Sequence, residues 1–123
     1  MSVSRTLRTP VIVRGTGLFT GAPASLEIGP APAGSGIVFV LSGERVPASI
    51  ANLSAKPLIP AFAQFPPRHT CITSPQGATL ATIEHAMSAL AGLGITDATL
   101  TCTDETGASS APEVPILDGS AAL

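Results

Sequence analysis

One stretch of the sequence, residues 82–95, has the apolar spacing of a helix, whereas the runs on either side are short and interrupted by glycine or proline. Ile83, Met87 and Leu90 recur every three or four residues and therefore share one helix face. Thr82 is suited to cap the start of this helix, and two glycines near its end are suited to stop it. The rest of the chain is therefore expected to consist of short strands and turns.

Short strands rich in β-branched residues are predicted on both sides of the helix. They cover residues 6–14, 25–28, 37–41, 45–50, 70–73, 78–81 and 96–102. Strands joined by tight turns around one helix indicate an α+β fold, a two-layer sandwich of a mostly antiparallel sheet with helix on one face. Asp118 or Ser120 is suited to cap a second helix, so we expect this sandwich to be truncated before its second helix.

The length of 123 residues indicates a single domain, 1–123. Within it, we expect residues 37–52 to form a small β-hairpin insert. Residues 55–68 are predicted to form a proline-rich loop, because four prolines exclude a regular helix or a central strand. This loop carries apolar side chains outward or onto a partner, namely Leu58, Ile59, Phe62 and Phe65.

The composition excludes some classes of partner. Only 11% of residues are charged and the formal net charge is -2, so the chain lacks the positive surface of a nucleic-acid-binding protein. Hydrophobic residues make up 45% of the chain, and we expect an exposed apolar face that a partner domain covers or that mediates self-association.

No apolar run is long enough to span a membrane, and arginines interrupt the N-terminal apolar residues where a signal peptide has none. Cys71 and Cys102 lack CxxC spacing and are interpreted as reduced, packed thiols. The sequence thus predicts a cytoplasmic protein that is not transmembrane.

Glu84 and His85 are the helix residues that can do chemistry. His85 lies on the side of the helix away from Ile83, so it is not a core histidine. The helix dipole favours both a charged Glu84 and a neutral His85 imidazole, the form that binds metal. Two interpretations stay open from these residues alone: a metal ligand beside a base, or a surface pair that only complements the dipole. The HExxH pattern is absent, so this helix supplies at most one histidine ligand.

Other polar residues have simple explanations. His69 follows the proline-rich loop and either adds polarity to it or contacts a bound ligand. Asp104 and Glu105 lie in a Gly-Ser loop and are interpreted as solvated. The glycine-rich turn at residues 15–21 is read as a hairpin turn, because a strand and not a helix follows it.

Two runs carry a resemblance to a known family: residues 82–95, TIEHAMSALAGLGI, and residues 112–121, PEVPILDGSA. Together they resemble the UDP-3-O-acyl-N-acetylglucosamine deacetylase family of lipid A biosynthesis. Residues 5–7, 15–21, 30–32 and 36–39 are similar to the opening strands of that family, in the same order. The domain 1–123 thus resembles the N-terminal half of the deacetylase.

The resemblance implies a zinc-dependent hydrolase that cleaves the acetamide of an acylated UDP-sugar between two similar domains. It implies that His85 is a zinc ligand and that Glu84 is the general base on the zinc-bound water. The remaining ligands are expected from a second deacetylase domain or chain. Phe19 stands where the family commonly has histidine, and with His69 and Thr70 it is a candidate for substrate contacts.

Two hypotheses of function follow. In the first, the chain is the N-terminal half of the deacetylase and needs a second domain or chain for activity. In the alternative, it is a non-catalytic binding or scaffold module that retains the deacetylase fold and holds a lipid or protein. A homodimer in which two copies gather a metal across a twofold axis is a further arrangement.

Overall fold

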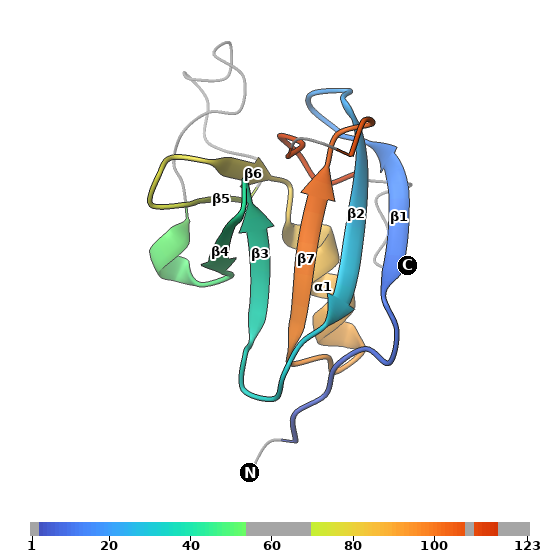
Figure 1. Cartoon of the computed structure of the whole chain (residues 1–123), viewed down its shortest axis with the longest axis vertical. Coiled ribbons are helices and arrows are strands. Elements are labelled where there is room, and N and C mark those ends of the chain that lie inside the picture. Colours follow the sequence, from blue (N-terminus) through green and yellow to red (C-terminus); the bar gives the residue numbers. More distant parts are fainter. Residues whose placement is uncertain (1–2, 54–69, 108–109, 116–123) are drawn as a thin grey trace.

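The computed structural model describes residues 3–53, 70–107 and 110–115. Its strands are β1 (Val11–Thr16), β2 (Pro23–Pro30), β3 (Ile37–Leu41), β4 (Glu44–Pro47), β5 (Cys71–Thr73), β6 (Thr79–Ala81) and β7 (Ala98–Thr103). The helices are the short 3-10 helix η1 (Ile50–Asn52) and α1 (Glu84–Gly92). This part of the chain is mostly β, with a mixed five-stranded sheet, a two-stranded sheet and one short α-helix. Figure 1 shows α1 behind the larger sheet, against one of its faces.

The larger sheet has the strand order β1-β2-β7-β3-β4, which places β7 in its middle (Figure 1). β7 pairs antiparallel with β2 and parallel with β3, and the outer pairs β1–β2 and β3–β4 are antiparallel. The sheet is therefore mostly antiparallel, as predicted. The parallel pair arises because the chain passes through β5, β6 and α1 between β3 and β7, a connection long enough to return to the same end of the sheet.

The central strands have one buried face. In β7 the side chains of Ala98, Leu100 and Cys102 are buried, whereas the three intervening threonines are half-buried. β2 repeats this alternation with Ala24, Leu26 and Ile28. Alternation with a period of two is the pattern of a sheet that packs on one side only, and it directs the buried set toward α1.

The first strand begins later than the sequence predicted, at Val11 instead of residue 6. The carbonyl of Arg5 accepts hydrogen bonds from the backbone N–H groups of Thr96 and Asp97, at 2.9 and 3.0 Å. The N-terminal segment is thereby bonded to the connection that enters β7. Pro10, which has no N–H group, directly precedes β1.

The predicted hairpin of residues 37–41 with the segment after residue 44 is present as β3 and β4. Its two turn residues, Ser42 and Gly43, have φ values of 50° and 83°, as a tight two-residue hairpin turn requires. β4 ends at Pro47, earlier than the predicted residue 50, where η1 begins. Because β3 also pairs with β7, this hairpin is part of the five-stranded sheet.

The predicted helix is present as α1, but its predicted cap is wrong. Ile83 occupies the N-cap position and makes no side-chain cap hydrogen bond. At the other end, the N–H groups of Gly94 and Ile95 donate to the carbonyls of Ala91 and Leu90, and Gly94 has a φ of 71°. This is a Schellman ending, which satisfies the last carbonyls of the helix.

One core joins the two sheets and the helix. Leu26, Phe39 and Leu100 have no exposed surface and form the sheet side of this core. Ala86 and Leu90 of α1 and Leu80 of the two-stranded sheet pack against the same cluster. Each fully buried large side chain contributes about 1.5–3 kcal/mol through the hydrophobic effect. The core therefore fixes how α1 lies on the sheet.

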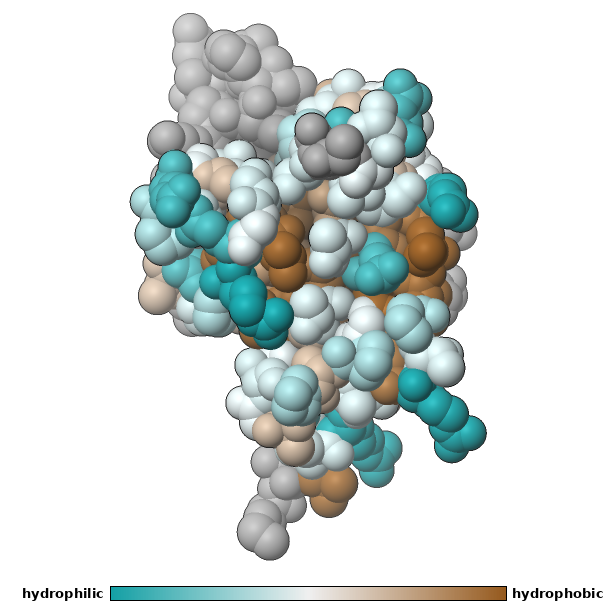
Figure 2. All heavy atoms as spheres, viewed as in Figure 1, coloured by the Kyte–Doolittle hydropathy of each residue, from teal (hydrophilic) through white to brown (hydrophobic). Residues whose placement is uncertain are grey.

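The opposite face of the larger sheet is the one seen in Figure 2, where hydrophilic and neutral atoms predominate and apolar atoms show between them. The exposed large apolar side chains among the described residues are Val3, Val11, Ile12, Leu18, Leu53 and Leu93. Among the helices of the described residues, none is long and apolar enough to cross a bilayer. The predicted proline-rich loop at 55–68, His69 and the cap positions Asp118 and Ser120 lie outside the described residues.

Candidate functional site

Glu84 and His85 are the first two residues of α1, directly after the joint that leads from β6. Oε2 of Glu84 accepts a hydrogen bond from the backbone N–H of Thr70 at 3.1 Å. The carbonyl of Thr70 in turn accepts from the N–H of Ile83 at 3.2 Å. Thr70, a sequence candidate for substrate contacts, is thus held against Glu84. The carboxylate also lies in the first helical turn, where the helix dipole favours a negative charge.

His85 is half-buried and does not belong to the core cluster, as its position on the helix predicted. Ser88 and Gly92, which the sequence places on the same side of the helix, are exposed, and Ala89 is half-buried. The small side chains on this side leave the imidazole open to approach. A half-buried imidazole and a hydrogen-bonded carboxylate, on consecutive residues, are groups of the types used in metal ligation and in proton transfer.

The described residues do not complete a metal site. Among residues 3–53, 70–107 and 110–115 there is no group of three His, Cys, Asp or Glu side chains that could hold a metal ion. A zinc site requires at least three protein ligands, and His85 is one nitrogen donor of the type that zinc prefers. The described part of the chain therefore fits a fraction of a zinc site, and no chemical step through zinc follows from it alone.

Glu113 is a functional candidate that sequence reasoning missed. Its side chain is only 1% exposed. The N–H of Phe19 donates to both carboxylate oxygens, at 3.1 and 3.2 Å, and the N–H and hydroxyl of Thr20 each donate to Oε1 at 3.0 Å. The hydroxyl of Thr82 donates to Oε2. We call these four residues, Phe19, Thr20, Thr82 and Glu113, the Glu113 network.

The Glu113 network lies at the joint between β6 and α1. The N–H of Ala81 donates to the carbonyl of Pro112, and the N–H of Val114 donates to the carbonyl of Ala81, both at 3.0 Å. Residues 112–114 thereby run parallel to the end of β6. Phe19, another sequence candidate, is brought by this network to the segment that immediately precedes Glu84 and His85.

A signal for Glu113 was present in the sequence, since it is the one charged residue within the apolar run APEVPIL. A carboxylate flanked by residues that are usually buried needs hydrogen-bond donors from elsewhere in the fold. Those donors come from residues 19, 20 and 82, and no local pattern identifies them.

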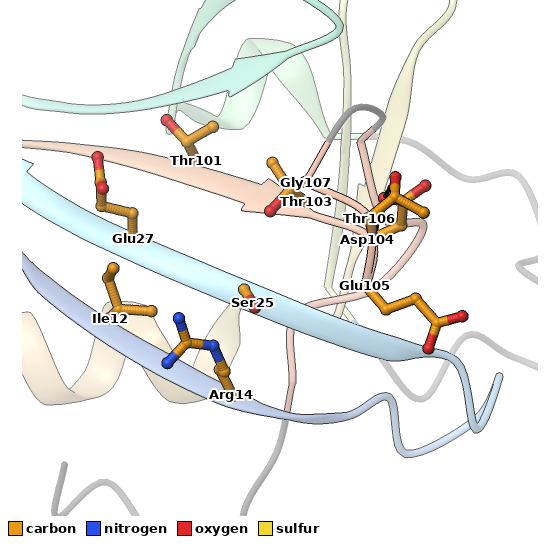
Figure 3. A pocket seen from close by; sticks show the side chains of 10 residues that line it. All are labelled: Ile12, Arg14, Ser25, Glu27, Thr101, Thr103, Asp104, Glu105, Thr106 and Gly107. Atoms are coloured by element: carbon orange, nitrogen blue, oxygen red, sulfur yellow. Dashed lines mark hydrogen bonds between the residues drawn. The ribbon is translucent and has the colours of Figure 1, made fainter.

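A depression of about 310 Å³ lies elsewhere, on the face of the larger sheet that is turned away from α1. Figure 3 shows it crossing β1, β2 and β7 and reaching the turn after β7. Its lining is polar around one apolar side chain and consists of Ile12, Arg14, Ser25, Glu27, Thr101, Thr103, Asp104, Glu105, Thr106 and Gly107. Neither Glu84 nor His85 contributes to it, so this depression is separate from the candidate site.

Both Cys71 and Cys102 are buried, as expected for packed thiols. Burial raises the pKa of the Cys102 thiol to about 12, so it is protonated at neutral pH. A protonated, buried thiol is a poor nucleophile. This observation excludes Cys102 from the candidate chemistry.

Glu84 and His85 are thus consecutive residues at the start of α1, one hydrogen-bonded to Thr70 and the other half-buried outside the core. Residues 4–123 match the model of the family described as LpxC, UDP-3-O-acyl N-acetylglycosamine deacetylase. The chain belongs to this family.

Curated relatives cover nearly the whole chain. This chain is 38% identical over 121 residues to a UDP-3-O-acyl-N-acetylglucosamine deacetylase of Psychrobacter cryohalolentis. The matched region covers 96% of the chain and 32% of that relative. The deacetylase of Shewanella baltica is 39% identical over 124 residues, covering 98% of the chain and 35% of the relative. The deacetylase of Myxococcus xanthus is 38% identical over 120 residues, with 96% and 33% covered. The chain spans about a third of the length of these relatives.

Proposed function

We propose that this chain is the N-terminal domain of a zinc-dependent deacetylase that hydrolyses the acetamide of a UDP-3-O-acyl-N-acetylglucosamine-type substrate in the cytoplasm. The observation that carries the proposal is the placement of Glu84 and His85 at the start of α1, in a chain of the LpxC family. A second domain or chain supplies the remaining metal ligands.

In this proposal His85 is the zinc ligand of the chain and Glu84 is the general base. When bound, zinc polarises the amide and lowers the pKa of a bound water to about 7. The hydrogen bond from the N–H of Thr70 to Oε2 of Glu84 holds the carboxylate, and within the described part of the chain Oε1 remains available to take a proton. Phe19, Thr70 and His69 are the candidates for contacts with the substrate.

The test is a chimera in which this chain replaces the matching first third of the Shewanella baltica deacetylase. We expect the chimera to bind zinc and to deacetylate the acylated UDP-sugar. The Glu84→Gln variant should retain zinc and lose activity on the order of 10²–10⁴-fold, as removal of a general base does. The His85→Ala variant should lose bound zinc.

Glu27→Gln is the matched control, because Glu27 is an exposed glutamate on the outer face of β2. This variant should keep both zinc and activity. If the chimera turned over substrate equally well with Glu84→Gln, the role of Glu84 as base would be refuted. A folded chimera without zinc and turnover would instead support the non-catalytic module.

A further inference from the structure

The carboxyl group of Glu113 is almost completely buried, although each of the described groups that donate a hydrogen bond to it is uncharged. Two of them are the consecutive backbone N–H groups of Phe19 and Thr20, and two are threonine hydroxyls. Burying a carboxyl group is costly unless its hydrogen bonds are made. Buried polar groups whose bonds are all made specify one arrangement of the segments that they join.

Three segments meet at this carboxylate. Phe19 and Thr20 belong to the turn between β1 and β2, and Thr82 belongs to the joint between β6 and α1. Glu113 itself lies in the segment that runs beside β6. Phe19 is 94 residues away from Glu113 in sequence and Thr82 is 31 residues away. The carboxylate therefore fixes distances that no local structure sets.

Thr82 has an unusual backbone conformation, with a φ of 61°. A β-branched residue in the left-handed region is strained and persists only when its surroundings support it. The hydroxyl of Thr82 is held by Glu113, and its side chain is 1% exposed. This conformation sets the direction in which α1 leaves β6, and so where Glu84 and His85 lie.

The turn before β2 is fitted to the same carboxylate. A Cβ atom on Gly17 would overlap the Glu113 carboxylate and the hydroxyl of Thr20. Gly17 is buried, and its backbone N–H and carbonyl bond to Ala22 and Gly21 at 3.0 Å. The turn thus approaches the carboxylate as closely as a residue without a side chain permits.

We propose that Glu113 is a positioning residue for the deacetylase site, which holds the Phe19 turn in a fixed place relative to Glu84 and His85. It acts through the backbone of Phe19 and through Thr82, and it does not itself contact the substrate. This inference rests on the proposed function, because it assigns Glu113 to the same site.

The test measures kcat, KM and zinc content of the Shewanella baltica chimera with Glu113→Gln. The glutamine has nearly the same size, but its NH2 group faces donors where the carboxylate oxygen accepted their bonds. We expect kcat to fall by about 10–10²-fold with zinc retained, since small misplacements of catalytic groups cost that much. The matched control is Asp97→Asn, a carboxylate of similar burial that accepts from Gly36 and Thr96. Its kcat should equal that of the unmodified chimera, even if its melting temperature falls.

A second pair of variants removes or keeps a single hydrogen bond. Thr82→Val keeps the branched shape and removes the hydroxyl, whereas Thr82→Ser keeps the hydroxyl. We expect kcat to fall in Thr82→Val and to be retained in Thr82→Ser. If Glu113→Gln and Thr82→Val were folded and as fast as the unmodified chimera, Glu113 would be purely structural and the proposal would be overturned.

An amide NMR spectrum of the 123-residue chain separates this inference from the proposed function. In Glu113→Gln the signals of Phe19, Thr20, Glu84 and His85 should shift together, and Asp97→Asn should leave them in place. If the unmodified chimera were inactive but these signals moved together, the proposed function would fail while the coupling of turn and helix start stood. If only Phe19 and Thr20 moved, the coupling would be refuted.

Discussion

Two carboxylates are buried to nearly the same degree near opposite ends of β7, at 1% exposure for Glu113 and 2% for Asp97. Asp97 precedes β7 and accepts bonds from the N–H of Gly36, 61 residues away, and from the hydroxyl of its neighbour Thr96, with further hydrogen bonds from Gly34 and Ser4. Glu113, beyond the other end, joins the β1–β2 turn, the β6–α1 joint and its own segment. The two carboxylates therefore join different sets of segments: Asp97 holds the entry to β7 against the turn before β3, and Glu113 holds the β1–β2 turn against the joint that leads into α1.

The largest expected effect tests this difference directly. Glu113→Ala removes the acceptor of four donor groups and should lower the free energy of unfolding by about 3–5 kcal/mol. Asp97→Ala removes the acceptor of the Gly36 N–H and of the Thr96 hydroxyl, with weaker bonds from Gly34 and Ser4, and should cost less because its carboxylate lies nearer to solvent. Urea unfolding of both variants measures the two losses. Equal losses would mean that this difference in nearness to solvent has no bearing on stability.

Gly17→Ala perturbs the Glu113 end without changing the carboxylate. The added methyl group meets the carboxylate and the Thr20 hydroxyl, and overpacking of this kind costs about 1–3 kcal/mol. Gly92→Ala is the control, because a Cβ there meets nothing within 4 Å and the residue is helical. Gly92→Ala should stabilise the chain by about 0.5–1 kcal/mol. Thermal unfolding of the two variants measures the predicted loss and the predicted gain of stability. An unchanged melting temperature in Gly17→Ala would show that the turn can move away from the carboxylate.

Asp97 should contribute to the way in which the free energy of unfolding changes at acidic pH. The N–H of Gly36 and the hydroxyl of Thr96 hold the pKa of Asp97 below its ordinary value of 3.8. A lowered pKa in the folded state contributes stability that is present above the unfolded pKa and is lost as the pH falls through the folded pKa. In Asp97→Asn the free energy of unfolding should therefore fall less as the pH is lowered. If the variant lost stability at low pH as steeply as the unmodified chain, other carboxylates would be the cause of that loss.

The smallest expected effect is a change in the rate at which a thiol reagent modifies Cys102. Sγ of Cys102 lies 3.5 Å from the carbonyl oxygen of Glu113, so modification of this thiol reports opening of the Glu113 end. Because burial raises its pKa to about 12, the folded thiol should react slowly at pH values near its ordinary pKa of 9.0. Glu113→Ala should accelerate labelling more than Asp97→Ala does. Equal rates in the two variants would mean that this end opens only with the whole fold.

Elements defined by neighbours in sequence were predictable. The helix at 84–92 follows from apolar spacing, and the β3–β4 hairpin and the β5–β6 pair follow from their turn residues. The placement of His85 outside the core follows from helix geometry. Each of these features depends on interactions over a few residues, which a sequence pattern records.

Features that depend on distant partners were not predictable. The parallel pairing of β3 with β7 requires a long crossover. Before the late start of β1, the carbonyl of Arg5 accepts hydrogen bonds from the N–H groups of Thr96 and Asp97, which are far away in sequence. Thr82 looked like a helix cap because hydroxyls commonly serve there, but its hydroxyl bonds to Glu113. Likewise, Glu84 and His85 could be placed on the helix, while the contact of Glu84 with Thr70 needed the fold.

The central position of β7 has a consequence for how the chain is made. During synthesis β1–β2 and β3–β4 emerge as two separate hairpins, and the strand that unites them is the last of the sheet to leave the ribosome. Until residues 98–103 are available, β2 and β3 each present an unpaired edge. Unpaired edges of this kind invite aggregation, and pairing across long separations is slow. Cellular yield of this protein should therefore respond to chaperone supply and translation speed more than its final stability suggests.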